Sequence, residues 1–221
     1  MLKDYKLPPH NNQPPQRAVI FLHGLGDSGA GGLLSIGQIW QPHLPDCLFL
    51  CPDAPFAFDM APPDFGGRQW FSLQTFDPVA MLHGAKTATP YLNDYIDHVM
   101  VTYNLTPDRI ALVGFSQGTI MALYTALRRN QSVACIVGYS GLLIGGETLA
   151  AEKKSAPPIL LVHGQMDDVV PFAAMAVAEQ GLQKAGLSVK TLACPYAAHT
   201  IDDNGLREGL IFIKRAWNMQ E

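Results

Sequence analysis

The 221-residue sequence predicts an α/β fold in which helices cover both faces of an open, mostly parallel sheet. Two observations favour this fold. Short apolar runs alternate along the chain with longer segments of helical periodicity. Most of these runs also lack polar alternation, as expected of parallel strands that are buried on both faces. Strands and helices that alternate in this way are joined by right-handed crossovers, which place the strands side by side in one sheet.

The expected strands are six apolar runs, and each is followed within two residues by glycine or proline. They are residues 18–22, 48–51, 110–113, 134–137, 159–162 and 189–193. Functional loops of a parallel sheet lie at the carboxyl ends of its strands. We therefore look for the chemistry of this protein directly after each run.

Helices are expected between the strands. Thr89 is the predicted N-cap of one helix, with Pro90 at its first position, and Pro107 lies beyond its end. After Pro90 the apolar residues recur at helical spacing. The other expected helices cover 116–129, 171–184 and 204–217.

The chain is predicted to form a single domain over residues 17–221, preceded by a polar, proline-rich segment at 1–16. Residues 52–81 fit neither strand nor helix, because they combine prolines and glycines with many aromatic residues. A loop of this length is usually functional or disordered, and the aromatic content argues against disorder. We expect a lid or a pocket wall, in which Trp70 and Phe71 form either a substrate platform or the core of the loop.

Charge and composition exclude several function classes. The formal net charge is −4 and no run of Lys and Arg exceeds two residues, which argues against nucleic-acid partners and anionic membrane surfaces. No apolar stretch reaches the roughly 18 residues of a membrane span, and the N-terminus has no apolar signal region. These features predict a soluble, cytoplasmic protein whose 4 cysteines are reduced, buried thiols. No zinc-binding or dinucleotide motif is present, so we expect neither a metal nor a cofactor.

A G-x-S-x-G motif at 114–118 directly follows the run 110–113 and opens a helical segment. The motif alone is a modest signal, but strand, tight turn and helix are the context of a nucleophile elbow. Glycines are needed because the turn leaves no room for larger residues. The start of the helix supplies N–H groups for a developing oxyanion. Ser116 is therefore the candidate nucleophile.

A serine nucleophile needs a base, and the base needs an orienting acid. In a fold with this elbow the chain order is serine, acid, histidine. Only His163 and His199 follow Ser116, and His163 precedes the suitable acids, so His199 is the expected base. Asp167 and Asp168 both lie just after a predicted strand, and their spacing alone does not choose between them.

The glycine-rich loop at 23–29 follows the first predicted strand and can supply the second oxyanion donor. The expected donors are the backbone N–H groups of Leu25 and Gln117. The side chains of His23 and Asp27 are expected to brace this loop by hydrogen bonds.

Together these motifs resemble the carboxylesterase/phospholipase family of α/β-hydrolases, which includes the acyl-protein thioesterases. The resemblance covers nearly all of residues 17–217. The segments that carry it are 21–29, 52–55, 70–71, 114–118, 139–141 and 163–171. It implies the α/β-hydrolase fold and a serine esterase that works without a cofactor.

The resemblance also assigns residues. It selects Asp167 over Asp168, because the family's acid lies four residues after the histidine that corresponds to His163. The family's nucleophile, base and oxyanion donors align with Ser116, His199, Leu25 and Gln117. Thr119 stands where the family often has glycine after the elbow.

The expected activity is that of a carboxylesterase acting on short- to medium-chain esters through an acyl-enzyme. The alternative within the family is an acyl-protein thioesterase or lysophospholipase that takes long acyl chains. A ligand-binding protein without catalysis belongs to another class, and the presence of all three candidate triad residues argues against it. The expected partner is a small ester or an acylated substrate, and the resemblance allows a homodimer.

Overall fold

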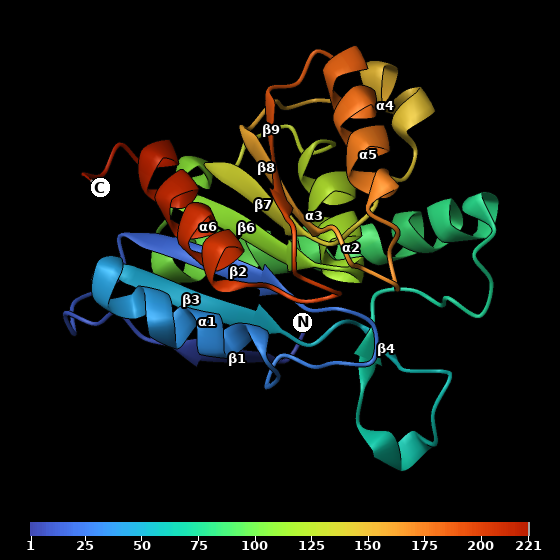
Figure 1. Cartoon of the computed structure of the whole chain (residues 1–221). Coiled ribbons are helices and arrows are strands. Elements are labelled where there is room, and N and C mark those ends of the chain that lie inside the picture. The colour runs from blue at the N-terminus through green and yellow to red at the C-terminus, as the bar shows by residue number, and fades with distance from the viewer. Residues whose placement is uncertain (221) are drawn as a thin grey trace.

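A seven-stranded sheet forms the centre of the molecule, in the order β1-β3-β2-β6-β7-β8-β9 (Figure 1). The computed structural model describes residues 1–220. The strands are β1 (Asp4–Leu7), β2 (Arg17–Leu22), β3 (Cys47–Pro52), β6 (Ile110–Phe115), β7 (Cys135–Tyr139), β8 (Ile159–Gly164) and β9 (Val189–Cys194). All neighbouring strands are parallel except β1, which is antiparallel to β3. The mostly parallel sheet and all six expected strands are confirmed.

Strand β1 was not expected. It lies within the N-terminal segment 1–16 and pairs with β3 at the edge of the sheet, with Tyr5 opposite Cys51. An edge strand of four residues that stays partly exposed needs no apolar run, so it leaves little signal in the sequence. Part of the segment that the sequence sets apart is therefore a strand of the main sheet.

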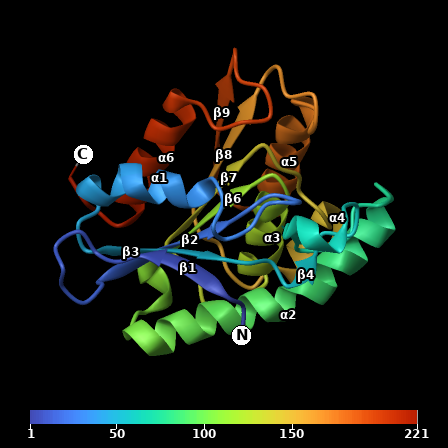
Figure 2. The same ribbon diagram turned by 90° about the horizontal axis from the view of Figure 1, so that it is seen from below.

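Helices cover both faces of the sheet, as predicted. They are α1 (Leu33–Trp40), α2 (Pro78–Tyr103), α3 (Gln117–Ala126), α4 (Gly146–Glu152), α5 (Ala173–Lys184) and α6 (Asp203–Ala216), with short 3-10 turns at Gln41–His43, Pro63–Phe65 and Pro107–Arg109. Helices α1 and α6 lie on one face, and α2 to α5 lie on the other (Figure 2). Each face therefore has its own apolar core.

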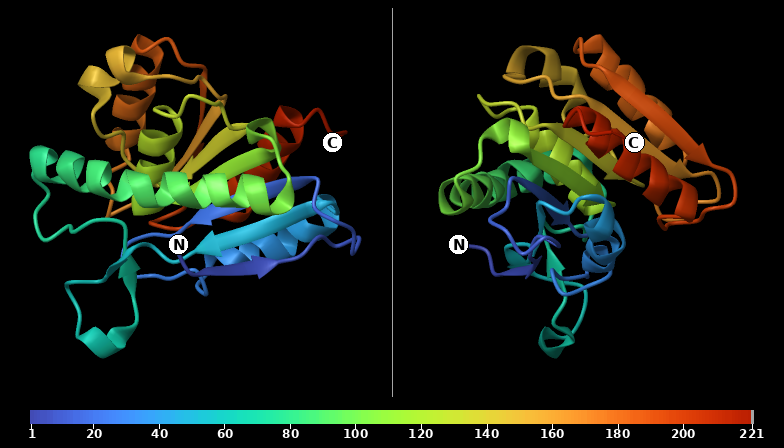
Figure 3. Two further views of the ribbon diagram at one scale, coloured as in Figure 1. Left: turned by 180° about the vertical axis from the view of Figure 1, so that it is seen from behind. Right: turned by 90° about the vertical axis from the view of Figure 1, so that its left-hand side faces the viewer.

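Helix α2 begins earlier than the sequence predicts, and the expectation that Thr89 is its N-cap is wrong. The side chain of Asp77 caps the helix by accepting the N–H of Ala80 at 2.8 Å, and Pro78 takes the first helical position. The pair Asp77-Pro78 is the same type of start signal as Thr89-Pro90. Pro90 lies inside the helix, which crosses the face of the sheet opposite α1 and α6 (Figure 3, left view).

Within residues 52–81, β4 (Phe56–Ala57) and β5 (Arg68–Gln69) form an antiparallel ribbon. We call residues 56–69 the ribbon. It projects beyond the carboxyl ends of the strands (Figure 1, teal). Its base is tied to the loop after β2, because Gly26 N–H donates to the Arg68 carbonyl at 2.9 Å and Arg68 N–H donates to the Asp27 carbonyl at 2.8 Å.

The four cysteines are all free and buried, as predicted. Within residues 1–220 no helix has both the length and the apolar character needed to cross a membrane.

Candidate active site

Ser116 lies at the sharp turn between β6 and α3, with φ 54° and ψ −117°. A non-glycine residue in this region is strained, and such strain concentrates at functional sites. The turn is tight because a Cβ at Gly118 would lie 1.8 Å from the carbonyl oxygen of Leu22, and one at Gly114 would lie 2.5 Å from the backbone of Gly118. The predicted strand, tight turn and helix are therefore present, and both motif glycines are required by the space.

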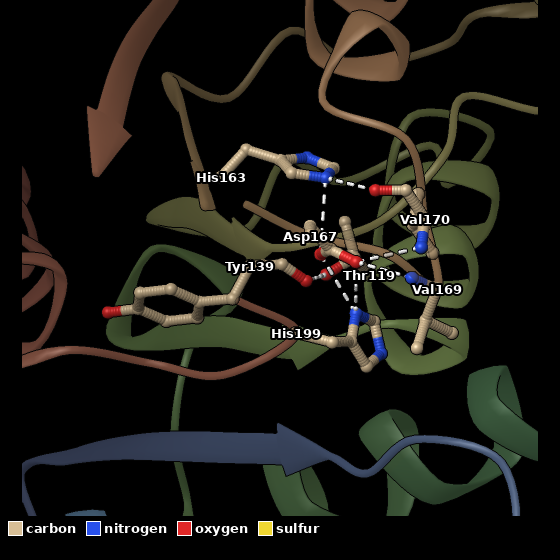
Figure 4. A network of polar contacts seen from close by, with 7 residues as sticks. All are labelled: Thr119, Tyr139, His163, Asp167, Val169, Val170 and His199. Carbon is tan, nitrogen blue, oxygen red and sulfur yellow. Dashed lines mark hydrogen bonds and ion pairs between the residues drawn. The ribbon is translucent and has the colours of Figure 1, made fainter. Parts of the chain in front are cut away.

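Asp167 and His199 lie together at the carboxyl ends of β8 and β9 (Figure 4). The Asp167 Oδ2 atom is 2.9 Å from His199 Nδ1, and its Oδ1 atom accepts the N–H groups of Val169 and Val170 at 3.0 and 2.8 Å. The Asp167 side chain is fully buried, whereas that of His199 is 17% exposed. Asp168 is exposed to solvent. The structure thus pairs His199 with Asp167 rather than with Asp168.

The environment of Asp167 keeps its carboxylate ionised. Burial raises the pKa of Asp167, but hydrogen bonds from His199 and from the backbone amides of Val170 and Val169 outweigh burial and hold that pKa below its usual range. An ionised Asp167 accepts a hydrogen bond from Nδ1–H of His199, and in this tautomer of the neutral imidazole Nε2 carries no proton. His199 therefore has the tautomer that a general base needs.

His199 lies next to the elbow, because its ring contacts the ring of Phe115. That ring lies 4.8 Å from the ring of His199, and Phe115 directly precedes the serine. Among the hydrogen bonds of residues 1–220, none joins the Ser116 hydroxyl to His199, and such bonds often tighten only when substrate is bound. A Cβ at Gly24 would lie 3.4 Å from the Ser116 Cβ, so the loop after β2 also approaches the serine.

The expected oxyanion donors are the amides of Leu25 and Gln117. No hydrogen bond between described residues uses either N–H group, so both can donate to a ligand. Gln117 is the first residue of α3, where helical N–H groups have no partner within the helix. Its side chain accepts the N–H of Trp70 at 2.9 Å and donates to the carbonyl of Phe71 at 2.7 Å. Gln117 thus joins the elbow to the two residues that directly follow the ribbon.

His23 braces the loop after β2, as expected. Its Nδ1–H donates to the carbonyl of Gly24 at 2.7 Å, and its Nε2 accepts the N–H of Ala54 at 3.0 Å. Burial lowers the pKa of His23, which keeps this imidazole neutral. Asp27 also braces this loop, because its carboxylate accepts the N–H of Ser28 at 2.8 Å.

Trp70 and Phe71 are 0% and 2% exposed, and Trp70 Nε1–H donates to the carbonyl of His23 at 3.1 Å. Fully buried rings present no surface to a substrate. The sequence offered two interpretations of Trp70 and Phe71, a substrate platform or the core of the loop. Their burial favours the core of the loop over the substrate platform.

Thr119 stands where the family often has glycine, and its side chain binds the backbone around the elbow. Its hydroxyl lies 2.8 Å from the carbonyl oxygen of Gly114 and 2.8 Å from that of Tyr139. The contact with Tyr139, which is drawn in Figure 4, links the elbow to β7. A Cβ at Gly141 would lie 2.4 Å from the Cβ of Thr119, so a neighbouring glycine provides the space.

Two polar residues beside Asp167 received no role from the sequence. His163 Nε2 donates to the carbonyl of Val170 at 2.9 Å and lies 3.4 Å from Asp167 Oδ2. Ser140 directly follows β7 with φ 46°, and its hydroxyl is buried without a hydrogen-bond partner among residues 1–220. Both lie just after a predicted strand and within segments that carry the family resemblance, 139–141 and 163–171, and these are the signals that could have pointed to them.

The sheet order, the helices on both faces and the serine elbow define the α/β-hydrolase class of enzymes. A sequence model described as Phospholipase/Carboxylesterase matches residues 9–216. The chain therefore belongs to the phospholipase/carboxylesterase family, and it is a serine ester hydrolase.

Similar proteins agree with this family. Acyl-protein thioesterase 1 homolog 1 of Dictyostelium discoideum is 30% identical over 160 residues, which cover 69% of each chain. Acyl-protein thioesterase 1 of Neurospora crassa is 29% identical over 196 residues, covering 82% of this chain and 79% of its own. The crystal structure of esterase PE8 superposes with a TM-score of 0.91 at 35% identity and covers 97% of this chain and 99% of its own.

Proposed function

We propose that Ser116, His199 and Asp167 are the catalytic nucleophile, base and orienting acid of this esterase. The observation that carries the proposal is the 2.9 Å contact between a buried Asp167 carboxylate and His199, beside a serine in a strained elbow. The three residues follow one another along the chain in the order serine, acid, base, which is the order that this fold uses.

In the reaction, Ser116 Oγ attacks the carbonyl carbon of the ester while His199 Nε2 takes the serine proton. The oxyanion accepts hydrogen bonds from the amides of Leu25 and Gln117, and each such donor typically lowers the barrier by about 3–4 kcal/mol. The bond to the leaving group then breaks, and His199 passes the proton to it. Water repeats the same steps on the acyl-enzyme, which releases the acid and restores Ser116.

The proposed substrates are esters with short- to medium-chain acyl groups. The similarity to esterase PE8 over nearly the whole of both chains supports a carboxylesterase. The burial of Trp70 and Phe71 also removes the aromatic platform on which a long acyl chain could lie.

A second candidate is an acyl-protein thioesterase or lysophospholipase. The names of the curated relatives favour it, and so do the exposed rings of Phe65 and Phe76 within residues 52–81, which are 60% and 75% exposed.

Hydrolysis of p-nitrophenyl esters from acetyl to palmitoyl separates the two candidates, with Ser116→Ala as the blank. We expect the highest kcat/KM at short to medium chains, whereas a maximum at palmitoyl would establish the second candidate. A fluorophosphonate probe should label Ser116 in the wild type and nothing in Ser116→Ala. Absence of label in the wild type would instead place the protein among ligand-binding relatives that lack catalysis.

A further inference from the structure

A cavity of about 330 Å³ lies beside His199, on the face of the sheet covered by α1. Its size falls at the lower end of the range of small-molecule sites. The residues that line it are Asp27, Gly32, Leu33, Ser35, Ile36, Phe115, His199, Thr200 and Ile201. They come from the loop after β2, the start of α1, the end of β6 and the loop after β9. The sequence alone assigned none of them to a substrate pocket.

The position of this cavity relative to His199 identifies the part of the substrate that can enter it. Nδ1 of the ring is bound to Asp167, so Nε2 is the nitrogen that exchanges protons with the reaction centre. The leaving-group oxygen must come within hydrogen-bond reach of Nε2 to receive its proton. The cavity is lined by His199 itself and by the two residues that follow it, Thr200 and Ile201. A group attached to the leaving oxygen therefore has this cavity next to it.

The lining also defines the chemistry of the occupant. Leu33, Ile36, Phe115 and Ile201 supply apolar surface, and none of the lining residues is a lysine or an arginine. Asp27 contributes a carboxylate, which repels an anionic group, most strongly at low ionic strength. Such a site accepts an uncharged, apolar alcohol of moderate size and disfavours a leaving group that carries a phosphate or a carboxylate.

We infer that the cavity between α1 and the loop after β9 is the leaving-group subsite, and that it selects esters of uncharged, apolar alcohols. This inference rests on the proposed function, because it takes Ser116 as the nucleophile and His199 as the acid that protonates the alcohol. In the acylation step the ester C–O bond breaks, the bond from Ser116 Oγ to the carbonyl carbon forms, and the serine proton leaves with the alcohol through His199. The alcohol is then released from the cavity before water attacks.

The first test narrows the cavity with Ile36→Trp and compares benzyl butyrate with methyl butyrate. Both esters form the same acyl-enzyme, so the ratio of their kcat/KM values reports on the leaving group alone. Filling a pocket that must hold a ring should lower the benzyl-to-methyl ratio by about tenfold or more. Ile39→Trp is the matched control, because Ile39 belongs to the same helix but is 54% exposed and does not line the cavity.

The substitution at Ile36 enlarges a buried side chain, so circular dichroism and thermal unfolding must show that the variant folds. Ile36→Ala provides the opposite change and should raise the ratio for 2-(1-naphthyl)ethyl butyrate over methyl butyrate. An unchanged ratio in every folded Ile36 variant would overturn the inference. A shift in preferred acyl length with a constant methanol leaving group would also overturn it, because the cavity would then be an acyl site.

The second test addresses the charge of Asp27. The substrates are benzyl butyrate and its 4-carboxybenzyl analogue, which differ by one carboxylate on the leaving group. Asp27→Asn keeps an oxygen that can accept the N–H of Ser28, and it should raise the ratio of anionic to neutral ester by several-fold at low salt. Asp64→Asn removes an equal charge from the exposed tip of the ribbon and should leave the ratio as in the wild type.

Equal ratios in Asp27→Asn and Asp64→Asn would refute the electrostatic part of the inference. Failure of the proposed function gives a different result, namely full hydrolysis of methyl butyrate by Ser116→Ala.

Discussion

Replacing Asp167 by Asn tests the proposed triad with the smallest change of shape. The amide oxygen can still accept the two backbone N–H groups at 3.0 and 2.8 Å. The amide nitrogen then takes the place of Oδ2, which lies 2.9 Å from His199 Nδ1. Because this nitrogen is a donor, the imidazole must carry its proton on Nε2. In that tautomer His199 cannot accept the proton of Ser116.

The size of the effect follows from this change of tautomer. In a serine protease the same exchange lowers kcat by about 10⁴-fold, and we expect a similar loss here. At 1.36 kcal/mol for each factor of ten, that loss corresponds to about 5 kcal/mol of transition-state stabilisation. The free energy of unfolding should fall by only about 1–2 kcal/mol, because two of the hydrogen bonds persist in weaker form.

The assay is steady-state hydrolysis of p-nitrophenyl butyrate, with urea unfolding to measure stability. Asp168→Asn is the matched control, since it removes the same charge from an exposed neighbour, and its kcat should stay within about twofold of wild type. A loss in Asp168→Asn as large as that in Asp167→Asn would show that the acid is misassigned. So would an Asp167→Asn enzyme that keeps a tenth of the wild-type kcat.

The other predictions concern the elbow and the pH dependence of stability. Ser116→Ala should lower kcat by about 10⁶-fold with an unchanged melting temperature, and a kcat within about 10³-fold of wild type would contradict the mechanism. Gly118→Ala should lower the free energy of unfolding, measured in urea, by about 1–3 kcal/mol, because the new Cβ would lie 1.8 Å from the carbonyl oxygen of Leu22. Gly32→Ala is the control and should leave stability unchanged, because its Cβ would have no neighbour within 4 Å. The pKa of Asp167 is lower in the folded protein than in the unfolded chain, where it is about 4. The ionised Asp167 carboxylate therefore contributes its full stabilisation above pH 4, and this stabilisation is lost as the pH falls through the lower pKa of the folded state. Urea titrations at pH 3 and pH 7 should therefore show a smaller acid-induced loss in Asp167→Asn than in wild type, and equal losses would refute this assignment.

Features that depend on local pattern could be predicted from the sequence. The six buried strands are predictable because burial on both faces leaves continuous apolar runs. The elbow is predictable because a serine between two motif glycines, placed at a strand-to-helix turn, is typical of an exposed nucleophile. The contact between Asp167 and His199 required the family resemblance, because spacing left Asp168 equally possible.

What could not be predicted depends on tertiary context. Strand β1 takes its stability from pairing with β3, so its own four residues need no strong pattern. Helix α2 continues through Pro90 because its buried face holds it against the sheet, and the Thr89-Pro90 pair therefore misled the boundary. The cavity beside His199 is built from four separate segments, and no linear pattern brings α1 next to the loop after β9.

The hydrogen bonds of the Gln117 side chain have a consequence for engineering. They fasten the residues directly after the ribbon to the elbow, while residues 59–62 and 64–66 at its tip are mostly exposed. A segment that is fixed at its base and solvated at its tip can be exchanged as a module. Tips of other length or composition could be grafted between Phe58 and Gly67, which are joined by a backbone hydrogen bond of 2.9 Å, with the catalytic geometry left in place.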